Sequence, residues 1–319
     1  MKQIYTYGNY LKDKFGCKVY KVGINISGFT CPNIDGTVAK GGCTFCENDS
    51  FSASTNEIQD LKGFHLNLDS KENPFLEKQL LQLEQQFSSI SKRQADEYGA
   101  EKFLVYFQSF TNTYAPFSTL KALYDKALSF ENVVGLSIGT RSDSITDETL
   151  EYLGKLNRDK EIWIEFGIQS VYDETLEKIN RGHSSDNVKE WILKSKEAGL
   201  HVCGHLIFGL PGESKEMMLE TSKQAYSWGI DSVKYHPLYV VKRTALANEF
   251  TRKTFVPITE EEYLKVLVES IQMKPQNVNV QRVTAGIDDD SLLAPTWCRN
   301  KNTQIKNINA ALKEIGLKY

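Results

Sequence analysis

The sequence predicts an α/β protein, a partial TIM-like barrel of six βα units with a C-terminal extension. Apolar runs rich in β-branched residues alternate with longer segments of helical periodicity, a pattern typical of a parallel sheet. Six units are fewer than the eight of a closed barrel. Because no internal repeat, low-complexity tract or Pro/Gly-rich linker divides the chain, we expect these units to form one open barrel.

The expected strands are short apolar runs bounded by turn residues. They are Lys21–Ser27, Phe103–Ser109, Val133–Ile138, Ile162–Gly167, His201–Phe208 and Ser232–His236. The expected helices repeat apolar residues at the helical period. They are Pro74–Lys92, Thr119–Leu128, Asp147–Leu156, Asp173–Ile179, Ser185–Ala198, Lys215–Trp228 and Glu260–Met273.

The last part of the chain follows a different pattern. It offers one more strand, Val278–Val283, and a final helix around Gln304–Ile315. We therefore expect two parts: a barrel with its N-terminal segment at residues 1–276, and a C-terminal extension at residues 277–319 that packs on the barrel.

Composition excludes several classes of protein. Hydrophobic residues at 40% and charged residues at 25% exclude a disordered or fibrous chain. No stretch approaches the roughly 20 apolar residues that span a bilayer, and the N-terminus has no apolar signal core, so we expect a cytoplasmic protein without a membrane partner. The net charge of −3 does not indicate a nucleic-acid binder, although residues 1–21 and the tail from Thr296 are locally basic.

Three of the six cysteines lie together, and in a cytosolic chain such clusters indicate a metal or redox site. Cys31, Cys43 and Cys46 follow directly on the first expected strand. Three thiolates suit a [4Fe–4S] cluster with one open iron, where a fully ligated cubane takes four. Zinc with a histidine is the rival interpretation, and no metal at all is the third; the nearest downstream histidine is His65. The isolated cysteines 17, 203 and 298 are expected to be small buried hydrophobes.

The cysteine loop resembles that of the radical S-adenosylmethionine (SAM) superfamily. Its long Cys-x11-Cys-x2-Cys spacing contains an internal Asp35-Gly36 and places Phe45 where the superfamily usually has an aromatic residue against adenine. The similarity extends from Tyr7 to Trp297 and points to the YhcC/YtqA family, in the branch shared by the elongator catalytic subunit and the oxygen-independent coproporphyrinogen oxidases. The resemblance implies that Cys31, Cys43 and Cys46 ligate the cluster and that SAM is the second cofactor.

Motifs at the ends of the next strands extend the resemblance to cofactor contacts. Gln108, Ser109 and Thr111 stand where many relatives carry a Gly-Gly-Glu stretch that binds the SAM amino group. Glycines are absent here, which leaves the contacting atoms open. Arg141, in a Gly-Thr-Arg-Ser-Asp segment, can pair with a carboxylate of cofactor or substrate, or the segment is a helix-entry loop capped by Asp143.

The fourth and fifth strands carry the remaining cofactor candidates. Gln169 and Arg181 match residues that contact the SAM ribose and carboxylate in relatives. Glu165 shares a strand face with Gln169 by period-two alternation, and it could reach ribose or substrate or form a structural ion pair. His205 could be a ligand, a proton carrier or a hydrogen-bonded core histidine. Gly209 begins the Gly-Leu-Pro-Gly turn that lies beside adenine in relatives.

Substrate candidates follow the sixth strand. They are Tyr235, His236, Lys242 and Arg243, for which an exposed basic loop is the plainer alternative. If the partner is a nucleic acid, we expect Lys242, Arg243 and the basic ends of the chain to form one positive rim around the barrel mouth.

The resemblance implies an enzyme in which the reduced cluster cleaves SAM and a 5′-deoxyadenosyl radical abstracts a substrate hydrogen. The YtqA-type motifs suggest tRNA as partner, with modification of the C5 side chain of the wobble uridine, possibly trimming carboxymethylaminomethyl to aminomethyl. An electron donor such as flavodoxin or ferredoxin is implied. Two alternatives stay open: a small metabolite or porphyrin-like substrate, and a non-enzymatic zinc or iron–sulfur binding module.

Overall fold

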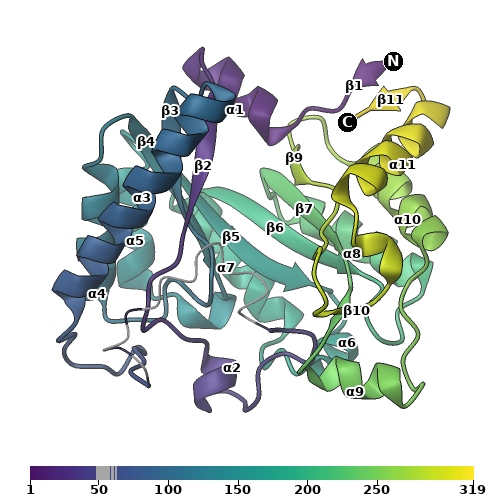
Figure 1. Ribbon diagram of the computed structural model, residues 1–319, viewed down its shortest axis with the longest axis horizontal. Helices are drawn as coiled ribbons and strands as arrows, with labels where there is room; N and C mark the ends of the chain where they lie inside the picture. Colours follow the sequence, from purple (N-terminus) through teal and green to yellow (C-terminus); the bar gives the residue numbers. More distant parts are fainter. Residues whose placement is uncertain (48–57, 59–60, 62) are drawn as a thin grey trace.

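A computed structural model describes residues 1–47, 58, 61 and 63–319 of the chain. Its centre is a sheet of order β2-β3-β4-β5-β6-β7-β9, in which every neighbouring pair is parallel. The sheet curls into an open half-barrel with helices on its outer face (Figure 1). Its strands are β2 (Val19–Ile24), β3 (Lys102–Phe107), β4 (Val133–Thr140), β5 (Glu161–Gln169), β6 (His201–Phe208), β7 (Ser232–Pro237) and β9 (Asn279–Arg282).

Several of the helices begin at a residue whose side chain caps the first turn. Thr146, Ser184 and Ser214 each accept a hydrogen bond from a backbone amide of the first turn, and Thr259 forms a capping box with Glu262. The helices are α1 (Tyr7–Phe15), α2 (Pro32–Asp35), α3 (Leu76–Tyr98), α4 (Phe117–Leu128), α5 (Asp147–Leu156), α6 (Asp173–Lys178), α7 (Ser185–Glu197), α8 (Lys215–Ser227), α9 (Ala245–Thr251), α10 (Glu260–Met273) and α11 (Lys301–Glu314). Within the described part of the chain, no helix is both long and apolar enough to cross a bilayer.

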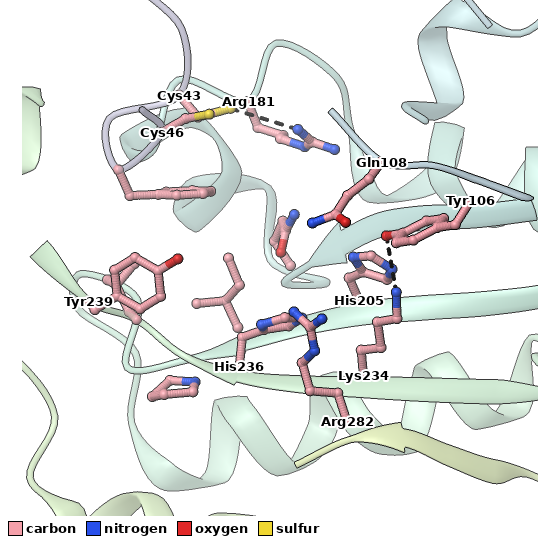
Figure 2. A pocket seen from close by; sticks show the side chains of 15 residues that line it. Cys43, Cys46, Tyr106, Gln108, Arg181, His205, Lys234, His236, Tyr239 and Arg282 are labelled. Atoms are coloured by element: carbon pink, nitrogen blue, oxygen red, sulfur yellow. Dashed lines mark hydrogen bonds between the residues drawn. The ribbon is translucent and has the colours of Figure 1, made fainter. Parts of the chain in front are cut away.

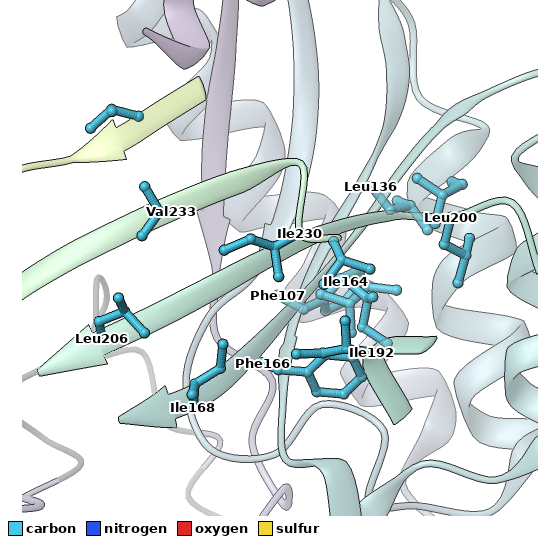
Figure 3. Packing of buried hydrophobic residues seen from close by; sticks show 14 of the residues in the cluster. Phe107, Leu136, Ile164, Phe166, Ile168, Ile192, Leu200, Leu206, Ile230 and Val233 are labelled. Atoms are coloured by element: carbon cyan, nitrogen blue, oxygen red, sulfur yellow. The ribbon is translucent and has the colours of Figure 1, made fainter. Parts of the chain in front are cut away.

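Alternation along the strands separates the apolar core from the barrel interior. On β5, Ile162, Ile164, Phe166 and Ile168 belong to the main core cluster between sheet and helices (Figure 3). Burial of each such side chain contributes about 1.5–3 kcal/mol. The alternating residues, among them Glu165 and Gln169, face the opposite side of the sheet. The core therefore fixes the strand on which the polar interior residues stand.

The expected strand Val278–Val283 is shorter than predicted and belongs to the barrel. As β9 it pairs in parallel with β7, which makes the sheet seven-stranded. Residues from 277 onward thus contribute a barrel strand as well as the packed helix α11. Neither local periodicity nor length revealed this, because the pairing joins segments about 45 residues apart.

Both chain ends lie at the amino ends of the barrel strands. The short strands β1 (Lys2–Gln3) and β11 (Leu317–Lys318) pair in parallel, as Figure 1 shows. On α1, Tyr10 Oη donates to Glu161 at the start of β5 over 2.7 Å, and Lys14 forms an ion pair with the same carboxylate. The expected single basic rim is therefore incomplete. The N-terminal basic segment lies at the opposite end of the strands from the cysteine loop, whereas Arg299 of the basic tail lies near the segment that contains Lys242.

Candidate functional site

The cysteine loop crosses the carboxyl ends of the strands and is fixed by backbone hydrogen bonds. Cys31 precedes α2, and Gly42 N donates to Asn33 O over 2.8 Å. Thr44 N donates to Ile179 O over 3.0 Å, while Thr44 O accepts from Leu246 N over 2.8 Å. The loop is thus held between the end of α6 and the start of α9.

The three clustered cysteines line one cavity of about 160 Å³. Asn33 Nδ2 lies 3.6 Å and Arg181 Nη1 3.7 Å from Cys43 Sγ, so two donors point at this sulfur. Burial, with the neighbouring Cys43 and Cys31, raises the pKa of Cys46 to about 12. Donors to a cysteine sulfur tune a metal site, and this loop provides them.

Gln169 and Arg181 reach this cavity through an unusual backbone. Gln169 has φ +66, at an irregularity in the pairing of β5 with β6. A Cβ on Gly167 would lie 2.6 Å from Arg181 Nη2 and 2.7 Å from Gln169 Nε2. Only glycine leaves room for both side chains, and strained residues of this kind cluster at functional sites.

Arg141 has a carboxylate partner within its own loop. Its Nε and Nη2 donate to the two oxygens of Asp143 over 2.8 and 2.6 Å, and Nη2 also donates to Arg181 O. Its Nη1 is buried and has no partner among the described residues. Arg181 Nε and Gln169 Oε1 are also buried and have no hydrogen-bond partner among the described residues. Three buried polar atoms therefore face a cavity beside the cysteines with their hydrogen-bonding capacity unused.

Glu165 is the hub of a buried ionic network. Its Oε1 accepts from Lys21 over 2.5 Å and from Ser137 over 2.6 Å, and its Oε2 accepts from Lys234 and, over 2.7 Å, from His205. Although burial opposes ionisation, Lys21 and Lys234 hold the pKa of Glu165 well below its usual range. Both oxygens are occupied, so Glu165 positions cations and does not reach into the cavity as a free ligand.

A second cavity of about 220 Å³ adjoins the first and shares Cys43, Cys46, Gln169 and Arg181 with it (Figure 2). Burial and the nearby Lys234 lower the pKa of His205 to about 4, and burial and Arg282 hold the pKa of His236 well below its usual range. Both imidazoles are neutral at pH 7. The carboxylate of Glu165 accepts from Nε2 of His205, which assigns the proton of His205 to that nitrogen.

The two cavities bring together most of the residues that the sequence singled out. Their lining includes Cys31, Cys43, Phe45, Cys46, Gln108, Thr111, Arg141, Glu165, Gln169, Arg181, His205 and His236. Ser109 is buried outside both linings, and Gly209 lines a separate cavity where a Cβ would lie 2.7 Å from Ile258.

The remaining substrate candidates lie elsewhere. Tyr235 is fully buried in the main core and its hydroxyl bonds to Tyr226, because strand alternation sends it to the helix side of β7. Lys242 and Arg243 are exposed, and Arg243 forms an ion pair with Glu47 of the cysteine loop. Neither lines the cavities beside the cysteines.

Sequence reasoning missed several residues of the site. Asn33 binds Cys43 and two backbone carbonyls, those of Asn180 and Arg181. Lys234 and Arg282 line the second cavity. Alternation on β7 could have found Lys234, since it faces the same side as His236.

The donor set favours a cluster over a compact metal ion. Among the described residues, only Glu165, Cys203 and His205 place three such ligand atoms within 4.8 Å of one another. Ammonium groups already occupy both oxygens of Glu165, and their charge opposes a cation there. The three clustered cysteines do not meet this criterion of 4.8 Å, whereas the ligands of a tetrahedral zinc site with bonds of about 2.3 Å would. Three sulfurs beside unpartnered donors suit a larger cofactor assembly.

Comparisons with known proteins agree with this geometry. The Radical SAM superfamily profile matches residues 36–225, and the Radical_SAM C-terminal domain profile matches residues 230–314. The protein YtqA of Bacillus subtilis is 32% identical over 316 residues, which cover 99% of this chain and 91% of YtqA. A tRNA uridine(34) acetyltransferase of Methanocaldococcus infernus is 32% identical over 157 residues, 48% of this chain and 29% of that protein.

A solved structure shares the fold. Elp3 of Methanocaldococcus infernus superposes with a TM-score of 0.59 at 20% identity, over 94% of this chain and 64% of that chain. These matches confirm the expected partial barrel and the resemblance to YtqA and elongator-like proteins.

Proposed function

Because this chain belongs to the radical SAM superfamily, we propose that Cys31, Cys43 and Cys46 hold one [4Fe–4S] cluster and that SAM binds in the cavity beside them. When bound, the cluster and SAM supply one-electron cleavage of SAM and a 5′-deoxyadenosyl radical that abstracts hydrogen. One observation carries the proposal: the buried, unpartnered atoms of Arg141, Arg181 and Gln169 line the cavity that the three cysteines share. A small flavodoxin- or ferredoxin-type reductant is the proposed electron donor.

The chain's own residues perform the binding and positioning. Arg181 and Arg141 offer cationic nitrogens to a carboxylate, and Gln169 offers an amide to a hydroxyl. Gln108 and Thr111 line the same cavity and are the proposed contacts for an amino group. Phe45 lines the adjoining cavity, where its ring can lie against a base.

Loss of the Gln169 amide should weaken SAM binding without removing the cluster. Gln169→Ala deletes a polar contact worth about 1–2 kcal/mol, so we expect the dissociation constant for SAM to rise about 5- to 30-fold. The measurement is equilibrium binding of SAM to the anaerobic, cluster-containing protein, with iron content determined on the same sample. Gln224→Ala on the outer helix α8 is the matched control. Unchanged SAM affinity in Gln169→Ala would contradict the assignment.

For the substrate, we propose tRNA and a modification of the C5 side chain of its wobble uridine, with trimming of carboxymethylaminomethyl to aminomethyl as the specific step. Support comes from the partial match to the tRNA uridine(34) acetyltransferase and from the fold shared with Elp3. Lys242 and Arg243 stand on a loop next to the cysteine loop and could contact phosphates.

One observation favours a small-molecule substrate as the second candidate. Arg243 is paired with Glu47. Hydrogen bonds from Ser291 lower the pKa of Asp289, and the nearby Arg299 and Lys242 lower it further. The charges at this edge of the mouth are therefore largely balanced, whereas a nucleic-acid surface usually carries excess cations. A small metabolite or porphyrin-like molecule would not need such an excess.

Deletion of the gene should change the tRNA of the cell if the proposal holds. We expect nucleoside mass spectrometry of bulk tRNA to show accumulation of a carboxymethylaminomethyl-type uridine and loss of the aminomethyl-type product. A plasmid carrying the intact gene should restore the parental profile, whereas the Cys43→Ala gene should not. A nucleoside profile identical to that of the parent strain would reject the tRNA substrate in favour of the small-molecule one.

A further inference from the structure

The half-barrel has an open seam, and the seam holds a cavity. The edge strands β2 and β9 are not paired with each other. Near the amino end of β9, Thr6 bridges to Val280, and across the gap Lys21 Nζ donates to Gln281 Oε1 over 2.7 Å. Beside this bridge lies a cavity of about 350 Å³ lined by β2, α3 and β9.

This seam cavity is strongly cationic. Lys21, Arg93, Lys234 and Arg282 line it, and no carboxylate does. Lys21 and Lys234 share the charge of Glu165. Arg93 and Arg282 form no hydrogen bond or ion pair with any residue that the structure describes. Both arginines are solvent-exposed, so they present two cationic groups at the open side of the cavity that no carboxylate of the described residues pairs.

Buried polar atoms of the lining also have unused capacity. Tyr7 Oη and Gln281 Nε2 are buried donors without hydrogen-bond partners in the described part of the chain. Gln94 Oε1 is a buried acceptor that likewise has no described partner. Burial raises the pKa of Tyr7 far above its usual range, so its hydroxyl keeps its proton as a donor. Leaving such groups unsatisfied costs free energy, and a ligand with several acceptor oxygens would satisfy most of them.

The seam cavity adjoins the larger cavity beside the cysteines. Tyr106, Gln108, Lys234 and Arg282 line both. Figure 2 shows Arg282 extending from β9 toward the space shared with His236 and Lys234. A molecule whose reacting part lies beside Cys43 and Cys46 can thus extend toward Arg282 without leaving the cavity.

We propose that the seam cavity is an oxyanion subsite, in which Arg282 and Arg93 bind a carboxylate or phosphate group of the substrate while its reacting carbon lies in the cavity beside the cysteines. The inference rests on the proposed function, because it takes that second cavity to be the place of reaction. Guanidinium groups suit this role because they bind planar carboxylates and phosphates through paired hydrogen bonds. The subsite assigns the substrate to the class of molecules with an anionic group close to the carbon that loses hydrogen.

The test measures anion binding directly. The cluster-containing protein is titrated anaerobically by calorimetry with inorganic phosphate and, separately, with acetate, at constant ionic strength in chloride. We expect one saturable site per chain. Arg282→Gln and Arg93→Gln should each weaken it at least about 10-fold, since a charge-assisted hydrogen bond contributes this much. Arg158→Gln, at an exposed turn before β5, is the matched control and should leave binding unchanged. Thermal unfolding of each variant establishes that it is folded.

The phosphate and acetate titrations distinguish the possible sources of the anion. Arginine-dependent binding of phosphate alone supports the subsite with a nucleotide phosphate as its ligand, and binding of acetate alone supports it with a side-chain carboxylate. Absence of saturable binding for both anions overturns the subsite, as does binding that Arg282→Gln and Arg93→Gln leave intact. Arginine-dependent binding together with an unchanged tRNA profile in the deletion strain keeps the subsite and rejects the tRNA substrate. A changed tRNA profile with arginine-independent binding rejects the subsite and leaves the tRNA function standing.

Discussion

Replacing Cys43 with alanine is expected to abolish the iron–sulfur chromophore and to reduce iron from about four atoms per chain to a small residue. Cys43 is the cysteine that receives two donors, from Asn33 and Arg181, and it lines both cavities beside the loop. With one of three ligands lost, two thiolates remain to hold the cluster. Iron and sulfide analysis, together with the visible charge-transfer absorbance of the cluster, measures the outcome on anaerobically purified protein.

The isolated cysteines provide the controls for this experiment. Cys17 is half-buried between α1 and the amino end of β2, whereas the loop follows the carboxyl end of that strand; Cys298 is buried near α11. Cys17→Ala and Cys298→Ala should keep the full iron content. Full iron content in Cys43→Ala would remove the proposed ligand set, and a colourless wild-type protein containing zinc would return the loop to the structural zinc alternative.

Local sequence was sufficient for most of the fold because the strands and helices are strongly periodic. The helix Glu260–Met273 and the strand His201–Phe208 have the expected bounds. On β5, alternation correctly placed Glu165, Gly167 and Gln169 on one cavity. Local signals decide such features, since side-chain direction follows directly from the strand period.

Features that depend on distant pairing were not predictable in the same way. The role of β9 as a barrel strand depends on its register with β7, and Arg282 enters the site only through that pairing. Tyr235 is not a substrate residue, because it lies in the main core whereas its neighbours Lys234 and His236 face the interior. The two ion pairs of Glu165, with Lys21 of β2 and Lys234 of β7, depend on the curvature of the sheet, which brings these strands toward β5. Tertiary arrangement decided each of these cases.

Removing the charge of Glu165 should destabilise the protein by about 3–5 kcal/mol. Glu165→Gln leaves the ammonium groups of Lys21 and Lys234 in the barrel interior without their common counter-charge, and an uncompensated buried charge costs this amount. Urea unfolding of the two proteins at pH 7 measures the difference. A loss below about 1 kcal/mol would show that the lysines do not depend on this carboxylate.

Two comparisons separate the buried charge from a general effect of substitution. Glu161→Gln removes a carboxylate whose partner Lys14 is half-exposed, so water can replace the pair and the loss should be smaller, near 1–2 kcal/mol. Adding Lys21→Met to Glu165→Gln removes one stranded cation and should restore part of the stability.

Because the pKa of Glu165 is lower in the folded than in the unfolded chain, its contribution to stability is complete above pH 4.5 and is lost as the pH falls further. Burial lowers the pKa of Lys21 to about 8 even beside Glu165, and loss of the carboxylate lowers it further. Folded Glu165→Gln therefore releases the Lys21 proton as the pH rises from 6 to 8, so the gap between the two proteins should narrow toward pH 8 as well as in acid.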